Sequence, residues 1–213
     1  VGIGGVSMRP LGLVLRSMGM QISGSDMNAS VSTDELIAKG IAVSIGHRAE
    51  NIEGADCVIR TAAANNDNPE IAAARAAGIP IFERAQAWGY IMRAYRHAIC
   101  VSGTHGKTTT TSMLTQIFME AGRDPTVMIG GSLPLLGAGH RVGQGDTIIL
   151  ESCEYCNSFL NFFPTTAVVL DVDADHLDFF KDLEDVKHSF RHFAELVPAD
   201  GLIVANGDDE NTM

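Results

Sequence analysis

The sequence has no apolar run long enough to span a membrane, and basic side chains are scarce. No stretch of about 18 apolar residues occurs, so we expect no membrane-spanning helix and no membrane partner. The first residues also lack the charged and apolar segments of a secretory signal. Lys and Arg total 15 against 26 Asp and Glu, a net charge of −11. This balance excludes a general nucleic-acid binder, which needs clustered basic residues, but local positive charge suffices for a small anionic substrate.

Hydrophobic residues make up 46% of the 213 residues, which excludes a disordered chain and suits one large or two small domains. Cysteines are few. Cys57 and Cys100 end apolar runs, so we expect both to be small buried hydrophobic residues. Cys153 and Cys156 form a C-x-x-C pair with no second pair to complete a metal site. Reduced thiols in the cytoplasm are the favoured interpretation over metal or redox chemistry.

The two ends of the sequence differ from those of a complete domain. A glycine-rich turn opens the chain at residues 1–5 with almost no strand before it, and a polar loop closes it at residues 206–213. A phosphate-binding turn normally follows a full strand. We therefore expect a fragment of a longer protein.

Short β-type runs alternate with amphipathic helical runs, which predicts an α/β fold with a mostly parallel sheet. Residues 1–95 are predicted to form a small Rossmann-like domain. Its predicted strands cover residues 20–23, 42–45, 57–61 and 79–82, and its helices cover 11–18, 33–39, 69–77 and 85–95.

The pattern restarts near residue 97, so residues 96–213 are predicted to form a second, incomplete domain with a P-loop. Its predicted strands cover 98–101, 126–129, 147–150, 166–170 and 201–205, and helices run to residue 121 and over 183–196.

A glycine-rich loop lies between the first strand and first helix of this second domain. Glycines let backbone N–H groups converge on phosphate oxygens, and a helix N-terminus adds positive partial charge. Lys107 is placed to contact the β- and γ-phosphates and Thr108 to bind Mg²⁺. The standard motif requires glycine where Val101 stands, so a shorter form of the loop is predicted. The predicted nucleotide-binding residues are Gly103, Thr104, His105, Gly106, Lys107, Thr108 and Thr109.

The glycine turn at residues 2–7 resembles a dinucleotide-binding turn, except that Ser7 replaces the last glycine. Asp26 follows the next strand, where such proteins hold a ribose. Ser7 disfavours a nicotinamide dinucleotide, so a different nucleotide is the alternative ligand, and a plain strand-to-helix turn is the alternative without a ligand. His47 and residues 61–63 follow other strands and are expected at the same carboxyl edge of the sheet.

Carboxylates and a histidine follow two strands of the second domain. Glu151 ends one strand and His176 follows another, so with Thr108 they are predicted to complete a Mg²⁺ site. The alternatives are a solvated strand end for Glu151 and a structural hydrogen bond for His176. Asp173 and Asp175 are alternatively helix N-caps. His188 and His192 lie four residues apart on a helix and are expected to be surface or packing residues.

Taken together, these motifs resemble the Mur ligases over essentially the whole chain. The resemblance is carried by G-x-G-G-x-S near the start, S-G-S-D at 23–26, G-T-H-G-K-T-T-T-T at 103–111, E-S-C-E at 151–154 and D-A-D-H-L-D at 173–178. His105 within the loop and the Glu151-to-His176 spacing favour the alanine-adding type over the later ligases.

The resemblance implies an ATP-dependent and Mg²⁺-dependent amide ligase of peptidoglycan synthesis. Its implied substrates are UDP-N-acetylmuramate and L-alanine, joined through an acyl phosphate, and it is implied to act as a monomer or weak homodimer. Lys107, Glu151 and His176 are the implied catalytic residues. The implied UDP-sugar contacts are Gly4, Gly5, Ser7, Asp26, His47, Thr61, Ala62 and Ala63.

Two departures from the family pattern stand out. Asp171 replaces the usual asparagine and adds a carboxylate beside the expected triphosphate. The family's C-terminal domain is absent, so these 213 residues alone are not expected to complete ligation. Rival interpretations are a ligase that adds a preformed tripeptide, a non-catalytic nucleotide-sugar-binding module, a P-loop ATPase module and, least favoured, a nicotinamide oxidoreductase.

Overall fold

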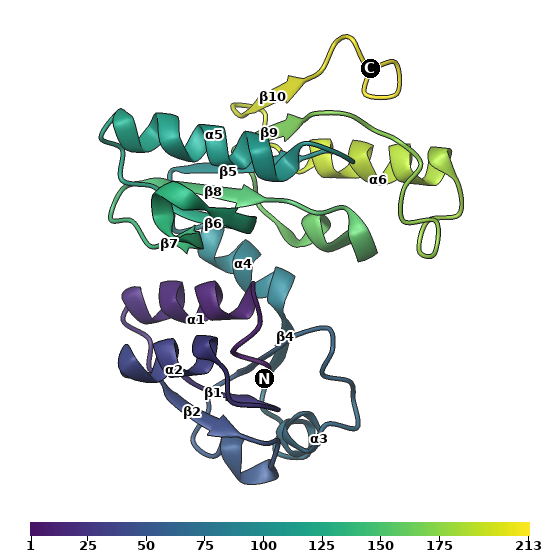
Figure 1. The fold of residues 1–213 in the computed structure, drawn as a ribbon. Coiled ribbons are helices and arrows are strands. Elements are labelled where there is room, and N and C mark those ends of the chain that lie inside the picture. Colours follow the sequence, from purple (N-terminus) through teal and green to yellow (C-terminus); the bar gives the residue numbers. More distant parts are fainter. The chain divides into compact units, whose positions relative to one another are not determined.

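The computed structural model describes all residues 1–213, and the chain forms two compact units, Val1–Ala87 and Trp88–Met213 (Figure 1). Helix α4 (Arg84–Met92) runs across the division between them. The predicted boundary at residues 95 and 96 lies just after this helix. None of the helices combines the length and apolar character that crossing a bilayer requires.

The first unit alternates short strands with helices, as predicted. Strands β1 and β2 pair in parallel, and so do β3 and β4. Backbone bonds from Gly2 and Ile3 to Ser25, and from Thr61 to Val1, connect the two pairs through residues 1–3. The elements are α1 (Met8–Ser17), β1 (Ser23–Asp26), α2 (Val31–Ala38), β2 (Ala42–Ile45), η1 (Ala49–Ile52), β3 (Val58–Arg60), α3 (Pro69–Ala76) and β4 (Ile81–Glu83).

Side-chain caps fix where two helices of this unit begin. Ser30 and Thr33 form a reciprocal capping box at α2, which satisfies backbone N–H groups that the first turn leaves unpaired. At α3, the Asn68 side chain accepts from the Glu70 N–H, and Pro69 occupies the first helical position. These caps explain why both helices begin close to the predicted residues.

Strand β1 lies at residues 23–26, so the predicted strand at 20–23 was wrong. The inward side chain at its centre is Ser25, which is buried and polar, and the apolar alternation that marks a strand is therefore missing. Gly24 is required because a Cβ there would lie 2.4 Å from the Ile3 side chain. Backbone pairing on both sides, rather than side-chain pattern, makes this segment a strand.

The second unit is built on one six-stranded sheet with the order β10-β9-β5-β8-β6-β7. All neighbouring strands are parallel except β6 and β7. The elements are β5 (His97–Ser102), α5 (Lys107–Glu120), β6 (Thr126–Leu133), η2 (Pro134–Leu136), β7 (Ala138–Arg141), β8 (Thr147–Glu151), η3 (Tyr155–Asn161), β9 (Thr166–Val169), α6 (Leu183–Glu195) and β10 (Leu202–Ala205).

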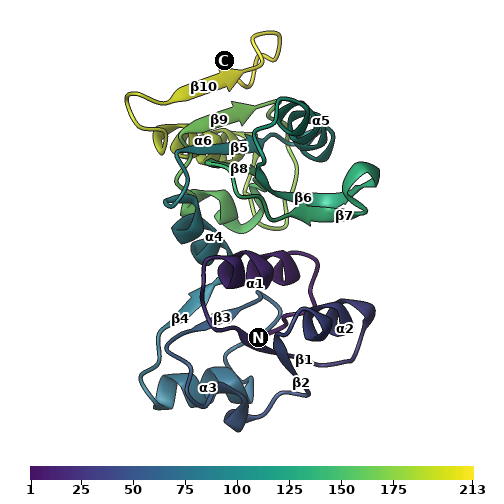
Figure 2. The same ribbon diagram turned by 90° about the vertical axis from the view of Figure 1, so that its left-hand side faces the viewer.

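The sheet separates the core of this unit into two parts, one on each face. Ile99, Val127 and Ile149 form a cluster against Leu114 and Phe118 of α5, which lies across β5, β8 and β6. Figure 2 shows the same sheet viewed from the side, with the carboxyl ends of the parallel strands at one edge. Ala98 and Cys100 alternate with Ile99 along β5, so they face the other side of the sheet.

Two sequence-based expectations about this fold need correction. Cys100 is fully buried as predicted, but Cys57 is exposed. Cys57 directly precedes Val58, which is buried at the start of β3, and alternation along an extended chain turns Cys57 outward. The hairpin formed by β6 and the antiparallel β7 was also not predicted, because β7 contains glycine, histidine and arginine and has no apolar alternation.

Candidate nucleotide and metal site

The glycine-rich loop connects the end of β5 to the first turn of α5. Gly106 is the N-cap of α5 and has a left-handed φ of 79°, which a side-chain-bearing residue rarely adopts. The loop thus carries backbone N–H groups to a helix N-terminus at the carboxyl edge of the sheet, the geometry of a phosphate site. Thr108 and Thr109 lie in the exposed first turn of the helix.

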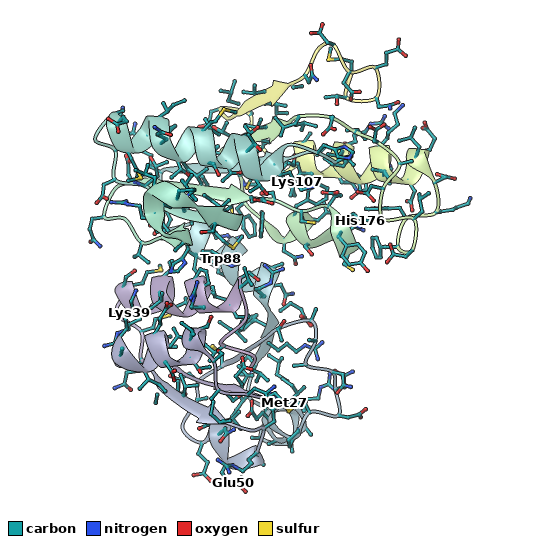
Figure 3. The ribbon with its side chains drawn as sticks, viewed as in Figure 1. Met27, Lys39, Glu50, Trp88, Lys107 and His176 are labelled. Carbon is teal, nitrogen blue, oxygen red and sulfur yellow. The ribbon has the colours of Figure 1, made fainter.

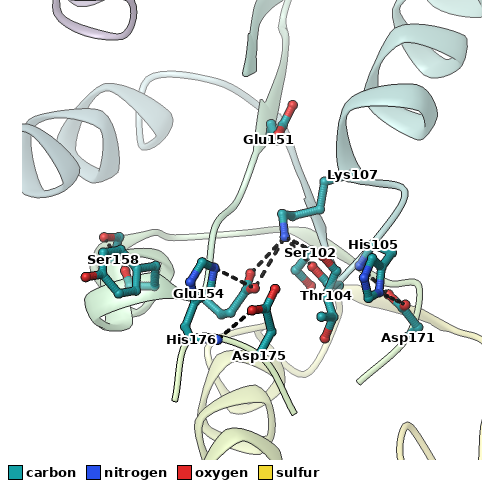
Figure 4. Close-up of polar contacts among 12 residues, drawn as sticks. Ser102, Thr104, His105, Lys107, Glu151, Glu154, Ser158, Asp171, Asp175 and His176 are labelled. Atoms are coloured by element: carbon teal, nitrogen blue, oxygen red, sulfur yellow. Dashed lines mark hydrogen bonds and ion pairs between the residues drawn. The ribbon is translucent and has the colours of Figure 1, made fainter. Parts of the chain in front are cut away.

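Lys107 is held at the centre of this edge. Its Nζ donates to the carbonyl oxygens of Gly103 at 2.6 Å and Thr104 at 3.1 Å. The same ammonium lies 3.0 Å and 3.3 Å from the two carboxylate oxygens of Glu154, a side chain that is only 2% exposed (Figure 4). The positive charge of the loop is therefore paired with a buried carboxylate.

Glu151 contacts the loop at a different point. The Thr108 hydroxyl donates to Glu151 Oε1 at 3.0 Å, and the Gly130 N–H donates to Glu151 Oε2 at 2.7 Å. The structure thus brings Thr108 and Glu151 together, as the predicted metal site requires. Figure 4 shows the Glu151 carboxylate standing apart from the Glu154 and His176 side chains.

His176 lies at the same edge, beside Glu154 rather than Glu151. Its Nε2 is 3.7 Å from Glu154 Oε1, and its ring packs on Tyr155 with the centroids 4.6 Å apart. Figure 3 shows His176 and Lys107 together beyond the ends of the strands. The Tyr155 hydroxyl donates to Asp178 at 2.8 Å, and this hydrogen bond raises the pKa of Tyr155 to about 12.

Asp171 ties the loop to the end of β9. One carboxylate oxygen accepts from the His105 N–H at 2.9 Å, and the other lies 3.1 Å from His105 Nδ1. Thr104 Oγ1 accepts from the Asp173 N–H at 2.8 Å. Asp173 and Asp175 are not helix N-caps, since α6 begins later and is capped by Asp182.

The donors at this edge fit a magnesium ion. Mg²⁺ prefers oxygen ligands, and Thr108 and Glu151 already share one contact through oxygen atoms. Glu154 adds a second carboxylate next to His176. Glu154 is the last residue of the E-S-C-E motif, but no role was predicted for it. Its signal was its place three residues after Glu151, close enough to serve the same strand end.

Among the predicted sugar-nucleotide residues, Asp26, His47 and residues 61–63 lie at the carboxyl ends of β1, β2 and β3, and the other three lie in the turn before α1. The Gly4 N–H donates to Asp26 Oδ2 at 2.9 Å, so the turn and the end of β1 are in contact. The Thr61 N–H donates to the Val1 carbonyl oxygen, which brings the third strand end to the same turn. Gly5, Ala62 and Ala63 are exposed, and Ser7 precedes α1 without capping it through its side chain.

His47 belongs to a buried polar network that the sequence did not reveal. Its Nδ1 lies 3.3 Å from Ser25 Oγ and 3.4 Å from Glu70 Oε1. Glu70 is 1% exposed and also accepts from Ser25 at 2.6 Å and Asn51 at 2.5 Å. A buried carboxylate with this many donors fixes the imidazole of His47 in place. Glu70 was missed because it occupies an ordinary helical position in α3.

Known proteins resemble the chain over nearly its full length. The UDP-N-acetylmuramate–L-alanine ligase of Clostridium botulinum is 48% identical over 211 residues, which cover 99% of this chain and 46% of that relative. The enzyme of the same name from Acetivibrio thermocellus is 48% identical over 213 residues, 100% of this chain and 45% of the relative. The chain thus spans less than half the length of these relatives.

Solved structures also resemble the chain. The UDP-N-acetylmuramate–alanine ligase of Thermotoga maritima has a TM-score of 0.86 and 31% identity, covering 99% of this chain and 49% of that one. The UDP-N-acetylmuramate:L-alanyl-γ-D-glutamyl-meso-diaminopimelate ligase of Neisseria meningitides has a TM-score of 0.87 and 29% identity, covering 99% and 71%. Residues 1–96 match the Mur ligase family catalytic domain and residues 101–213 the Mur ligase middle domain. The chain therefore belongs to the Mur ligase family.

Proposed function

We propose that this chain is part of an ATP-dependent amide ligase that joins L-alanine to UDP-N-acetylmuramate. The observation that carries the proposal is the cluster at the carboxyl edge of the second unit, where Lys107, Thr108 and three groups from other strand ends meet. The names of the relatives from Clostridium botulinum and Acetivibrio thermocellus support this choice of substrates. We also propose that it works in the cytoplasm, as a monomer or weak homodimer.

In this proposal the second unit binds ATP. Residues 103–109 surround the phosphates, and the Lys107 ammonium exchanges its contact with Glu154 for the β- and γ-phosphate oxygens. Mg²⁺ would be held by Thr108 and Glu151 on one side of the loop and by Glu154 and His176 on the other. The bound ion supplies neutralising charge for the phosphoryl group in transfer.

In the same proposal the first unit binds the UDP part of UDP-N-acetylmuramate. The turn at residues 4–7 leads into the N-terminus of α1, where an anion is stabilised. Asp26, His47 and Thr61 lie at the neighbouring strand ends, where ligands of open α/β sheets bind. The proposed contacts are Gly4, Gly5, Ser7, Asp26, His47, Thr61, Ala62 and Ala63.

The proposed reaction has two steps. A carboxylate oxygen of the muramate attacks the γ-phosphorus of ATP, and ADP leaves. The L-alanine amine then attacks the carbonyl carbon of the acyl phosphate, inorganic phosphate leaves, and the amine loses a proton as the amide forms. Lys107 stabilises the charge on the transferring phosphoryl group, and the rigid loop holds that group in position.

Calorimetry with the 213-residue chain tests the proposal. UDP-N-acetylmuramate is titrated in with and without Mg²⁺ and a non-hydrolysable ATP analogue. We expect the sugar nucleotide to bind in both cases and the ATP analogue to bind only when Mg²⁺ is present. Binding of the sugar nucleotide without any ATP-analogue binding contradicts the ligase proposal and favours a non-catalytic sugar-nucleotide module.

A tripeptide-adding ligase is the second candidate, and the likeness to the Neisseria structure favours it. Both candidates use the same sugar nucleotide and the same ATP site, so they differ only in the amine substrate. A phosphate-release assay on the full-length protein, with L-alanine or with L-alanyl-γ-D-glutamyl-meso-diaminopimelate, separates them. We expect release with L-alanine, and release with the tripeptide alone overturns the assignment.

A further inference from the structure

The segment after β8 places a thiol beside two groups of the candidate metal site. The Cys153 sulfur, a Glu154 carboxylate oxygen and a His176 ring nitrogen all lie within 4.8 Å of one another. Glu154 Oε1 and His176 Nε2 are 3.7 Å apart. Ligand atoms about 2.0–2.3 Å from a tetrahedral zinc ion lie about 3.3–3.8 Å from one another, so the Glu154–His176 separation fits such a site as it stands. We propose that Cys153, Glu154 and His176 form a binding site for a thiophilic divalent cation of the zinc and cadmium class.

The donor set selects this class of cation over magnesium. Mg²⁺ takes oxygen ligands and binds thiolates poorly, whereas zinc accepts sulfur, imidazole nitrogen and carboxylate oxygen together. Three protein donors leave a fourth position for water or a phosphate oxygen, as in open zinc sites. Neither the thiol nor such a cation takes part in the proposed ligase reaction. The site shares Glu154 and His176 with that reaction, so a bound thiophilic cation occupies the position needed for Mg²⁺.

The local backbone holds the three donors in place. The Ser152 N–H donates to the Val101 carbonyl oxygen at 2.8 Å, which anchors the chain to β5 just before Cys153. Cys156 and Asn157 both have a φ of 54°, so the chain turns sharply straight after Glu154 and Tyr155. His176 also has a positive φ, of 53°, and its ring rests on Tyr155. These constraints keep the donors together before any cation binds.

Lys107 opposes the cation. Its ammonium lies 3.0 Å from Glu154 Oε2, so a second positive charge on this carboxylate requires Lys107 to move away. The Cys153 thiol must also lose its proton to the buffer on binding, because the thiolate is the ligand. Cation binding at this site therefore competes with the Lys107–Glu154 ion pair. Removing the ammonium is expected to strengthen binding.

Cadmium titration of the 213-residue chain tests the proposal, followed by the ultraviolet charge-transfer absorption of cadmium thiolate. This signal requires a sulfur ligand, so it does not respond to the exposed His188 and His192 pair on α6. All variants carry Cys57→Ser, which removes an exposed thiol in the first unit. We expect the band to develop with one cadmium per chain and to survive a large excess of Mg²⁺.

Variants separate the proposed ligands from their neighbours. Cys153→Ser and Cys153→Ala should abolish the band, whereas the matched control Cys156→Ser should retain it. His176→Asn should weaken cadmium binding at least about tenfold, since even outer-shell changes have effects of this size. His188→Asn should leave it unchanged. A band that persists in both Cys153 variants, or that disappears in Cys156→Ser, overturns the proposal.

One variant is expected to gain affinity for cadmium rather than lose it. Lys107→Ala should bind cadmium more tightly than the parent while its circular dichroism spectrum stays that of the folded parent, because an unfolded chain exposes the Cys153 and Cys156 pair to cadmium. Unchanged or weaker binding in Lys107→Ala contradicts the proposed position of the cation. The measurement requires no ATP or sugar nucleotide, so it stands or fails separately from the proposed ligase function.

Discussion

Lys107 makes more contacts than any other side chain of the phosphate loop. Two loop carbonyl oxygens and the buried Glu154 carboxylate together hold its ammonium. These contacts fix the conformation of the loop, and the Lys107 ammonium compensates the charge of Glu154. When a phosphate binds the Lys107 ammonium in place of Glu154, the Glu154 carboxylate needs another cation nearby to compensate its charge. This is consistent with the proposed need for Mg²⁺.

Lys107→Ala is predicted to abolish ATP binding and to leave UDP-N-acetylmuramate binding intact. The reason is that Lys107 is placed to contact the phosphates of one ligand, while the proposed contacts of the other lie in the first unit. Calorimetry with each ligand measures both effects. Lys187→Ala, on the exposed side of α6 beside Glu184, is the matched control and should bind both ligands normally. Loss of both ligands in Lys107→Ala argues against two separate sites.

Asp171 determines which ring nitrogen of His105 carries a proton. A carboxylate only accepts hydrogen bonds, so the contact between Asp171 Oδ2 and His105 Nδ1 requires a proton on Nδ1. An asparagine at position 171 can accept from the His105 N–H and donate from its amide to Nδ1. We predict that Asp171→Asn moves His105 to the Nε2–H tautomer.

Nitrogen-15 NMR of the imidazole ring measures this change directly. The His105 side chain is 71% exposed, so the stability of the fold should change by less than about 1 kcal/mol. His97→Asn serves to assign another exposed ring, which lies near Asp146. Identical ring shifts for His105 in the parent and in Asp171→Asn would disprove the proposed proton position.

At the scale of elements, aromatic packing joins η3 to α6. The Phe159 ring is fully buried, stacks on Phe193 with centroids 4.5 Å apart, and meets Phe190 edge-on at 5.3 Å. This contact lies directly after the segment that carries Glu154. Packing of α6 therefore fixes the chain that forms the candidate metal site.

Phe159→Ala is predicted to lower the free energy of unfolding by about 3–5 kcal/mol, the usual effect of removing a buried aromatic ring. Urea denaturation followed by circular dichroism measures the change. Phe179→Ala is the matched control, because Phe179 is 43% exposed and should cost about 1 kcal/mol or less. Equal losses in the two variants contradict the assignment of Phe159 to the core.

Burial in β5 raises the pKa of the Cys100 thiol to about 12. The folded state thus favours the protonated thiol, and its contribution to stability is present below the unfolded pKa and lost as pH rises toward 12. At pH 8 we predict that a thiol reagent modifies Cys57, Cys153 and Cys156 in the native chain and Cys100 only after unfolding. Counting reacted thiols before and after adding denaturant checks this. Four thiols reacting rapidly in the native chain would refute it.

Strands with apolar sequences were predictable, and strands with polar sequences were not. The runs at residues 98–101 and 147–150 are continuous and buried, and both lie within the strands of the structure. Strand β1 was displaced by three residues because Ser25 is its buried side chain. At the site, the loop and Glu151 follow strand ends directly and were found. Glu154 and Glu70 were missed because tertiary contacts, rather than local pattern, bury their carboxylates.

At the scale of the whole molecule, the proposed anionic ligands bind a chain with a net charge of −11. Long-range attraction therefore contributes nothing to their binding. The favourable groups are local: Lys107, the N-terminal ends of α1 and α5, and a divalent cation. Each of the two units has its own glycine-rich turn before a helix. The two proposed ligands should therefore contact separate sets of backbone amides.

Hydrogen exchange measured by mass spectrometry tests this division. We predict that UDP-N-acetylmuramate slows exchange in residues 2–7 but not in 103–109, and that Mg²⁺ with an ATP analogue does the reverse. Some amides exchange only through an opening that releases the ligand. At a ligand concentration of about 100 times the dissociation constant, these amides should exchange up to about 100-fold more slowly. In Lys107→Ala the ATP analogue should protect neither segment, while protection by the sugar nucleotide persists. Protection of residues 2–7 by the ATP analogue alone would reverse the assignment of ligands to the two units, because only the second unit carries the lysine-containing loop.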